Sequence, residues 1–200
     1  MEKTIVVPGE KLDKNVTGDV FIEKDNAFSM VLGLLEKRDP ASPARLISLN
    51  GKYVPNRDDQ VIGIVADVRH GGVSLEINLP YSAFLQTDYE YGYQDVILAR
   101  VQDVTETRSV LLDQDRKLVG GELIEISPTK VSRVIGKNNS MISMISEKTK
   151  STIYVGRNGR IWLKSGDIAK AEQAIYKIEK EAHTTGLTER IKAFLETPAA

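Results

Sequence analysis

The sequence predicts an α+β protein of several domains, because its pattern of apolar and turn-forming residues changes along the chain. Residues 1–57 and 58–121 consist of short apolar runs separated by turn formers, which is typical of β-strands. From residue 122 the pattern becomes strand, two helices, two strands and a long helix, in the order βααββα. We therefore expect an N-terminal β-rich domain over 1–57, a barrel over 58–121 and an α/β module with a C-terminal helix over 122–200.

The N-terminal domain is predicted to contain short strands and no catalytic constellation. A short apolar run near its start ends at Pro8. Residues 45–49 and 52–54 flank an Asn50-Gly51 step, which predicts a hairpin because Asn-Gly favours a tight type I′ turn. We expect this part of the chain to serve as a docking or spacer domain.

The middle of the chain predicts a five-stranded OB barrel, because about five strands follow one another in about sixty residues. The strand over 61–68 contains Gly63, which suits a tight barrel bend. Tyr89, Tyr91 and Tyr93 alternate like one face of a strand. We interpret these tyrosines as packing or interface residues before base-stacking ones.

The C-terminal module is predicted from helix and turn signals. Residues 129–135 and 140–149 predict two short helices, and Asp167 is a good N-cap for a long third helix. An Asn-Gly step between two strands predicts a hairpin whose turn consists of Gly156, Arg157, Asn158 and Gly159. Apolar residues at spacings of three and four predict that the long helix packs on a sheet through Ile168, Ala171, Ile175, Ile178 and Ala182.

The composition excludes several classes of function. The chain has no cysteine, which excludes disulfides, thiolate zinc sites and cysteine nucleophiles and makes a reducing cytoplasm the expected compartment. Its histidines, His70 and His183, lie too far apart in sequence for metal-ligand spacing, so no metal or cofactor is predicted. The apolar run at the start is too short for a signal peptide or a bilayer span, so no membrane partner is expected.

Positive charge is concentrated in one segment of a nearly neutral chain. The formal net charge is -1, yet residues 122–165 carry 8 Lys or Arg and only 3 Asp or Glu. Residues 58–121 carry the opposite balance, with 5 basic and 11 acidic side chains. Phosphate contacts need Lys and Arg, so the predicted α/β module is the part of the chain that suits a nucleic acid.

The motif Val-Ile-Gly-Lys-Asn-Asn-Ser over residues 134–140 lies in that basic segment. A tight loop between two short helices leaves backbone N–H groups unpaired at the start of the second helix, and these form a natural phosphate site. The predicted RNA-binding residues of this loop and its flank are Lys130, Arg133, Gly136, Lys137, Asn138 and Asn139. An ordinary helix–turn–helix connection is the alternative interpretation.

This loop, with the βααββα order around it, resembles the type I KH domain. In that family the loop clamps about four nucleotides of single-stranded backbone, while an adjacent apolar groove holds the bases. The family pattern has glycine at both ends of the loop, and here the second position is Asn139. Asparagine tolerates the left-handed backbone conformation better than most residues, so the turn is expected to form.

Residues 58–121 resemble the ribosomal-protein S-one type of OB fold, in which exposed aromatic side chains stack on bases. The stacking positions around the glycine turn correspond to His70 and Val73, and a histidine position after the next strand corresponds to Gln86. RNA contacts from the barrel loops are therefore predicted for Arg69, His70, Arg100 and Arg108. The alternative is that these are solvated arginines balancing an acidic barrel.

The whole chain resembles the RNA-binding cap subunit of the archaeal exosome that carries S-one and KH domains. The resemblance depends on Val-Val-Pro-Gly-Glu at 6–10, Tyr-Ser-Ala-Phe-Leu at 81–85, the segment 156–162 and the segment 181–188. It implies a non-catalytic subunit, three copies of which sit on a hexameric exoribonuclease ring, capture RNA 3′ ends with a preference for adenine-rich tails, and guide them into the pore for 3′-to-5′ degradation. It also implies that the N-terminal domain docks on the ring and that residues 156–159 pack against the barrel.

Three other functions stay open from the residues themselves. An RNA-cutting enzyme needs convergent carboxylates or placed histidines, and Asp113 and Asp115 beside Arg116 and Lys117 are the compact candidate. A barrel followed by a KH domain also suits an RNA-binding module of a transcription or translation complex. A structural scaffold with little RNA contact is the third, and the acidic barrel and Asn139 favour it.

Overall fold

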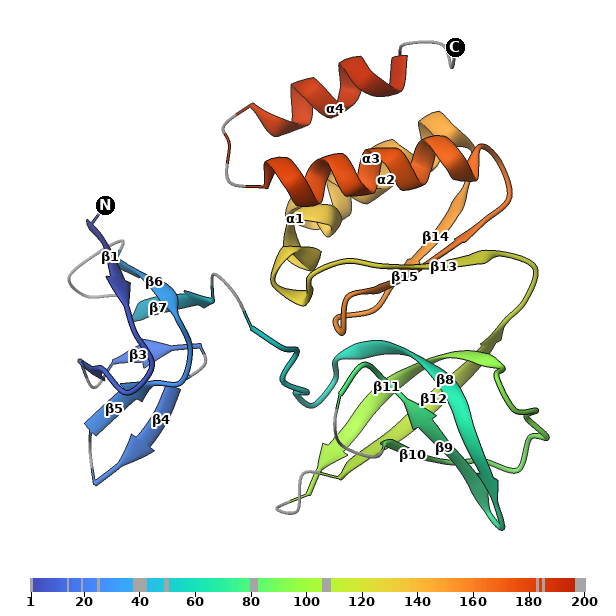
Figure 1. Cartoon of the computed structure of the whole chain (residues 1–200), viewed down its shortest axis with the longest axis horizontal. Helices are drawn as coiled ribbons and strands as arrows, with labels where there is room; N and C mark the ends of the chain where they lie inside the picture. Colours follow the sequence, from blue (N-terminus) through green and yellow to red (C-terminus); the bar gives the residue numbers. More distant parts are fainter. Residues whose placement is uncertain are drawn as a thin grey trace. The chain divides into compact units, whose positions relative to one another are not determined.

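The computed structural model describes residues 2–13, 15–18, 20–24, 26–37, 43–48, 51–79, 83–105, 109–182, 184 and 186–196. The chain forms two compact units, residues 1–52 and residues 53–200 (Figure 1). Strands and helices are both present, which confirms the predicted α+β class. In the described ranges no helix has the length and apolar character needed to cross a membrane.

The N-terminal unit consists of two small sheets. Its strands are β1 (Glu2–Val6), β2 (Lys11–Leu12), β3 (Val16–Thr17), β4 (Val20–Glu23), β5 (Asn26–Ser29), β6 (Gly33–Lys37) and β7 (Ala44–Ser48). One sheet has the order β1-β6-β7-β3 and the other the order β2-β5-β4. Val6, Leu12, Ala27 and Leu46 come from both sheets and form a small buried core. The domain is therefore β-rich, as predicted.

The hairpin predicted around Asn50-Gly51 is wrong. Residues 44–48 do form a strand, but β7 pairs antiparallel with β6 and parallel with β3, and residues 52–54 form no strand. Asn50 itself lies outside the described residues. Tyr53 is instead 8% exposed and packs in the core of the barrel, where its hydroxyl donates to the Asp59 carboxylate at 2.8 Å. Burial of the ring and this hydrogen bond, rather than local turn preference, decide the conformation of the segment.

A closed five-stranded barrel follows, and its topology confirms the predicted OB fold. Its strands are β8 (Gln60–Arg69), β9 (Gly72–Glu76), β10 (Ala83–Gln86), β11 (Val96–Val104) and β12 (Val110–Leu118). They close in the order β10-β12-β11-β8-β9, with β10 parallel to β12 and every other pair antiparallel. A Cβ at Gly63 would lie 3.0 Å from side-chain atoms of Leu75 and Ile77, so the predicted glycine permits close packing inside the barrel.

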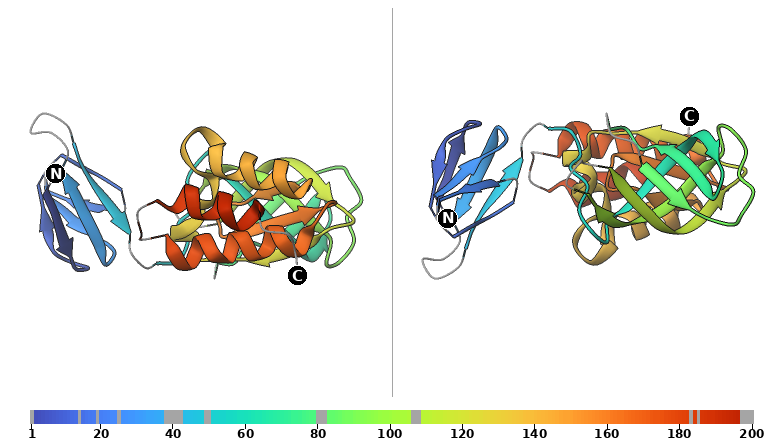
Figure 2. Two further views of the ribbon diagram at one scale, coloured as in Figure 1. Left: turned by 90° about the horizontal axis from the view of Figure 1, so that it is seen from above. Right: turned by 90° about the horizontal axis from the view of Figure 1, so that it is seen from below.

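The C-terminal module has the predicted βααββα order and a further helix. Its elements are β13 (Glu122–Glu125), α1 (Val131–Ile135), α2 (Ser140–Thr149), β14 (Thr152–Val155), β15 (Arg160–Lys164), α3 (Ile168–Glu181) and α4 (Leu187–Glu196). The antiparallel sheet order β13-β15-β14 is that of a type I KH domain. The helices lie on one side of this sheet, with α2 and α3 against it and α4 packed on α2 and α3 (Figure 2). The Asp167 side chain caps α3 by accepting from the Lys170 N–H at 3.0 Å, as predicted.

The barrel and the KH module share an apolar and an ionic contact within the second unit. Trp162 on β15 is 6% exposed and clusters with Ile62 and Leu98 of the barrel. The Arg160 guanidinium donates to the Glu76 backbone carbonyl of the barrel at 2.7 Å and forms an ion pair with the Glu76 carboxylate. It also donates to the Glu125 carboxylate of its own module at 2.8 Å. Its side chain is only 5% exposed, so these partners offset the cost of burying its charge.

Candidate nucleic-acid interface

The loop between α1 and α2 has an unusual backbone conformation. Gly136 has φ 75° and ψ 174°, and an added Cβ there would lie 2.7 Å from the Met141 Cβ and 2.8 Å from its backbone nitrogen. Asn138 and Asn139 follow with φ of 52° and 62°, in the left-handed region. Glycine is therefore required at the first position, whereas asparagine can adopt the conformation at the last two.

This loop leads directly into the N-terminus of α2. Asn139 is the residue that precedes the helix, and its side chain forms no capping hydrogen bond with any described residue. The first N–H groups of a helix have no partner within it and point outward with the positive end of the helix dipole. The loop therefore presents backbone donors to an anion approaching from solvent.

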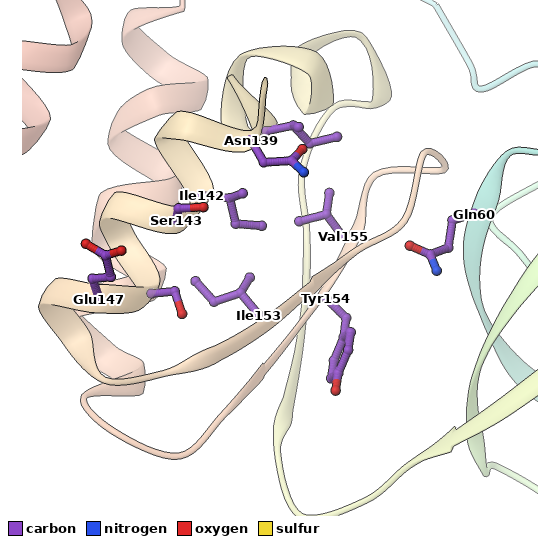
Figure 3. A pocket seen from close by; sticks show the side chains of 10 residues that line it. Gln60, Asn139, Ile142, Ser143, Glu147, Ile153, Tyr154 and Val155 are labelled. Atoms are coloured by element: carbon purple, nitrogen blue, oxygen red, sulfur yellow. The ribbon is translucent and has the colours of Figure 1, made fainter. Parts of the chain in front are cut away.

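A groove of about 440 Å³ runs beside the loop, between α2 and β14 (Figure 3). Ile135, Ile142, Ile153 and Val155 line it with apolar side chains. Its polar lining consists of Gln60, Asn139, Ser143, Ser146, Glu147 and Tyr154. An open groove with apolar walls and carboxylate, amide and hydroxyl groups at its rim can hold flat, polar-edged rings such as nucleobases.

Three basic residues lie in the loop or precede it in the chain. Lys137 at the tip and Arg133 on α1 are exposed, and Lys130 is half-buried. Over the described part of the chain, none of these three has a carboxylate within ion-pair distance. Of the six residues predicted from the loop motif, Asn139 lines the groove, and the three cations have no ion-pair partner among the described residues.

Apart from Asn139, which precedes α2, the groove residues on this face of α2 were missed in the sequence. Asn139, Ile142, Ser143, Ser146 and Glu147 recur at spacings of three and four, which places them on one face of the helix. That spacing mixes apolar and polar residues, so it does not stand out as a core-facing stripe. The spacing can be read from the sequence, but it indicates a groove only because β14 lies opposite this face of the helix.

Two of the barrel candidates, Arg69 and His70, lie away from the KH groove. Arg69 ends β8 and His70 lies in the β8–β9 turn, at the end of the barrel remote from the KH module (Figure 1). Arg69 Nε donates to the Asp67 carboxylate at 2.8 Å, and both side chains are exposed. Arg108 lies outside the described residues. The structure therefore does not gather Arg69 and His70 with the loop candidates into a single site.

Arg100 lies in strand β11 and not in a loop, which corrects its expected position. Its guanidinium donates to both Asp113 carboxylate oxygens, at 3.0 and 2.8 Å, and to Asp58 at 3.3 Å. The hydrogen bond from Arg100 lowers the pKa of Asp113 below its usual value of 3.8, and the same bond raises the pKa of Arg100. Because two carboxylates already occupy this cation, it is less available to a phosphate than the loop cations.

The hairpin turn over residues 156–159 contacts the barrel. Asn158 is fully buried and hydrogen-bonds to Ile62 and Ile77 of the barrel. The Arg157 N–H donates to the Gln60 carbonyl at 2.7 Å, while its exposed guanidinium reaches the Ser132 Oγ at 3.4 Å. These bonds give the turn a role in joining the two modules.

Comparisons with known proteins agree with this geometry. A family model described as KH domain matches residues 121–169. The chain is 39% identical to an exosome complex component Rrp4 from Methanothermus fervidus, over 97% of this chain and 96% of that protein. It is 38% identical to the protein of the same name from Pyrococcus furiosus, over 96% of this chain and 83% of that one. A solved structure described as an exosome complex RNA-binding protein covers 73% of this chain and 96% of its own, with a TM-score of 0.66 and 38% identity.

Proposed function

The chain belongs to the Rrp4 family of exosome complex components, and from this premise we propose that it is a non-catalytic RNA-binding cap subunit of the exosome. It captures single-stranded RNA 3′ ends, favours adenine-rich tails, and guides them into the pore of a hexameric exoribonuclease ring for 3′-to-5′ degradation. The observation that carries this proposal is the α1–α2 loop beside the apolar groove, with free cations at one end.

The loop binds the phosphate backbone of an RNA strand, and the groove binds its bases. A phosphate lies at the N-terminus of α2, where backbone N–H groups and the Lys137 ammonium donate to its oxygens. The bases lie along Ile142, Ile153 and Val155, which remove their faces from water. The Asn139 amide can pair with the N6 and N7 edge of adenine, which supports the proposed preference for adenine-rich RNA.

The N-terminal unit is proposed to dock on the ring, as one of three cap subunits. Its surface exposes several large apolar side chains, namely Ile5, Val7, Phe21, Ile22, Met30 and Leu32. Exposed apolar residues in one small domain favour a protein interface, because their burial against a partner removes them from water. The core of this unit is small, so its surface rather than its interior carries this role.

Removing residues 1–52 is expected to abolish association with the ring while residues 53–200 stay folded and still bind RNA. The cut precedes Tyr53, because that ring is buried in the barrel core and its loss would destabilise the second unit. Co-elution with the purified hexameric ring in size-exclusion chromatography measures the effect. The full chain is the positive control. An Ile22→Glu variant, which changes one side chain that is 68% exposed, is a milder test of the same interface. Co-elution of the truncated protein would refute the docking role.

The two acidic residues considered for catalysis, Asp113 and Asp115, both accept hydrogen bonds from neighbouring side chains. Asp113 accepts two hydrogen bonds from Arg100, and the Asp115 carboxylate accepts one from the Tyr91 hydroxyl. Both contacts lie within or beside the barrel wall, so they favour a structural role for these carboxylates over metal binding or proton transfer.

The purified chain is therefore expected to leave end-labelled RNA at full length in the presence of magnesium and inorganic phosphate. Addition of the exoribonuclease ring is expected to start shortening from the 3′ end, and to shorten bound RNA faster than the ring alone. A denaturing gel over a time course measures both. Shortening by the chain alone that survives an added chromatography step would establish intrinsic catalysis instead. RNA binding without any ring association would favour a module of a transcription or translation complex.

A further inference from the structure

One outer face of the barrel wall lies against the KH module. The register of β8, β11 and β12 places Ile62, Leu98 and Arg116 in one row across these strands, so their side chains point to the same side of the wall. Ile62 and Leu98 are buried in a cluster with Trp162 of the KH sheet. Arg116 continues the row but is exposed. It therefore lies at the edge of the contact between the two modules.

The Arg116 side chain reaches across this edge to the KH module. Its guanidinium carbon lies 5.2 Å from the centre of the Tyr154 ring on β14. This ring packs against the apolar cluster between the modules, whereas the neighbouring Ile153 and Val155 pack against the KH core. Successive side chains of a strand point to opposite faces, and Figure 3 shows the Tyr154 ring pointing away from α2. Arg116 thus lies on the barrel side of β14.

Strand β14 lies between the KH groove and Arg116. It is an edge strand of the KH sheet, so no further strand of that sheet follows it toward the barrel. Tyr154 and Gln60 of the barrel both line the groove, and the Arg157 N–H donates to the Gln60 carbonyl at 2.7 Å. A single strand that leaves the groove over this edge toward the barrel therefore reaches Arg116.

Stacking on Tyr154 orders the Arg116 guanidinium without using its hydrogen-bond donors. A guanidinium contacts an aromatic ring through its face, while its five N–H groups point outward in its plane. That planar fork matches the spacing of two phosphate oxygens, so it can donate to both of them at once. Because the ring already restricts the side chain, less conformational freedom is lost when a phosphate binds.

Among the described cations of the barrel, Arg116 alone has no carboxylate partner. The other three, Arg69, Arg100 and Lys117, each form an ion pair with an aspartate. Residues 58–121 carry 11 acidic side chains, so a shortage of carboxylates does not explain why Arg116 is unpaired. An ordered guanidinium beside a groove that binds bases fits the anion that accompanies those bases, which is the backbone phosphate.

We infer that Arg116 binds a phosphate of the RNA strand whose bases occupy the KH groove, and so extends the RNA path from the KH module onto this wall of the barrel. The inference rests on the proposed function, since it concerns the same strand. The buried Asn158 and Trp162 join the two modules, so the phosphate site at the α1–α2 loop and Arg116 are held in fixed relative positions before RNA binds. RNA that fills only the groove gains nothing from Arg116, whereas longer RNA gains one phosphate contact.

Fluorescence anisotropy with the full chain and two labelled single-stranded RNAs, measured over a salt series, tests the inference. One RNA has about four nucleotides, the length that a KH groove holds, and the other is several times longer. Arg116→Gln is expected to weaken binding of the long RNA by about 5-fold at about 0.1 M salt and to reduce the slope of log K against log salt by about 0.7, the effect of one lost phosphate contact. Its affinity for the short RNA should equal that of the wild type. Arg116→Lys should keep the wild-type slope, because the charge remains.

Lys117→Gln is the matched control for this variant. It removes the same charge from the next residue of β12, whose side chain points to the other face of the strand and pairs with Asp95. It should bind both RNAs with the wild-type slope. Unchanged binding of the long RNA by Arg116→Gln would show that Arg116 only covers Tyr154, and would overturn the inference. An equal loss for both RNAs, an equal loss in Lys117→Gln, or a loss without a change of slope would also overturn it. Failure of the wild-type chain to bind either RNA would instead refute the proposed function.

Discussion

Asn158→Ala is expected to lower the free energy of unfolding of the barrel–KH unit by about 3 kcal/mol, because three buried backbone groups lose their partner. The Asn158 side chain accepts from the Ile62 N–H at 3.2 Å and donates to the Ile62 and Ile77 carbonyls at 2.8 and 3.0 Å. Asn158 is fully buried, so water cannot replace these bonds without a structural change.

The Asn158 amide pairs with backbone groups of β8 at a point where the neighbouring strand β9 has ended. Strand β9 pairs with β8 from Ile64 onward, and the chain turns away at Ile77. Beyond that point the Arg157 N–H bonds the Gln60 carbonyl, and the Asn158 amide bonds both backbone groups of Ile62. A side chain with one acceptor and two donors is needed, and asparagine is the shortest residue that has them.

Urea unfolding followed by circular dichroism measures this effect as a shift of the midpoint at constant slope. Arg157→Ala is the matched control, because the neighbouring guanidinium is exposed and its loss should change stability by less than about 0.5 kcal/mol. Asn158→Asp keeps the acceptor but loses both donors and buries a charge, so it should destabilise at least as much as alanine. Equal stability of Asn158→Ala and Arg157→Ala would show that the amide does not join the two modules.

Joint replacement of Lys130, Arg133 and Lys137 by glutamine is expected to weaken RNA binding by on the order of 10-fold or more at low salt, because these cations lie beside the phosphate site of the loop. Each lost phosphate contact on a single strand reduces the slope of log K against log salt by about 0.7, so three contacts reduce it by about 2. The variant should fold normally, since over the described residues none of the three is in an ion pair.

A salt titration by fluorescence anisotropy gives both affinity and slope for this triple variant. A matched triple variant of Lys164, Lys180 and Lys192 removes the same charge from exposed positions that do not line the groove. It should bind RNA with a slope close to that of the wild type. If both triple variants lose affinity equally, overall charge rather than the loop attracts RNA; if neither does, the loop is not on the RNA path.

The order and type of most elements of the barrel and the KH module follow from local patterns in the sequence. The stripe from Ala171 to Ile178 lies buried against the sheet, and Asp167 caps the helix that carries it. The loop at Gly136 adopts the tight turn that its residues predict. Such features depend on backbone preferences and spacings within a few residues, so they can be inferred from a short stretch of chain.

Which side chains contact one another follows from the packing of the folded chain and cannot be inferred from local sequence. Tyr53 does not form the predicted hairpin, because its ring packs in the barrel core. Arg100 lies in a strand beside Asp113. The partners of Asn158 lie 96 and 81 residues away in sequence. Contacts over such distances follow from the packing of whole modules, because burial in a shared core outweighs local turn preference. No spacing in the sequence shows which loops lie beside the same cavity.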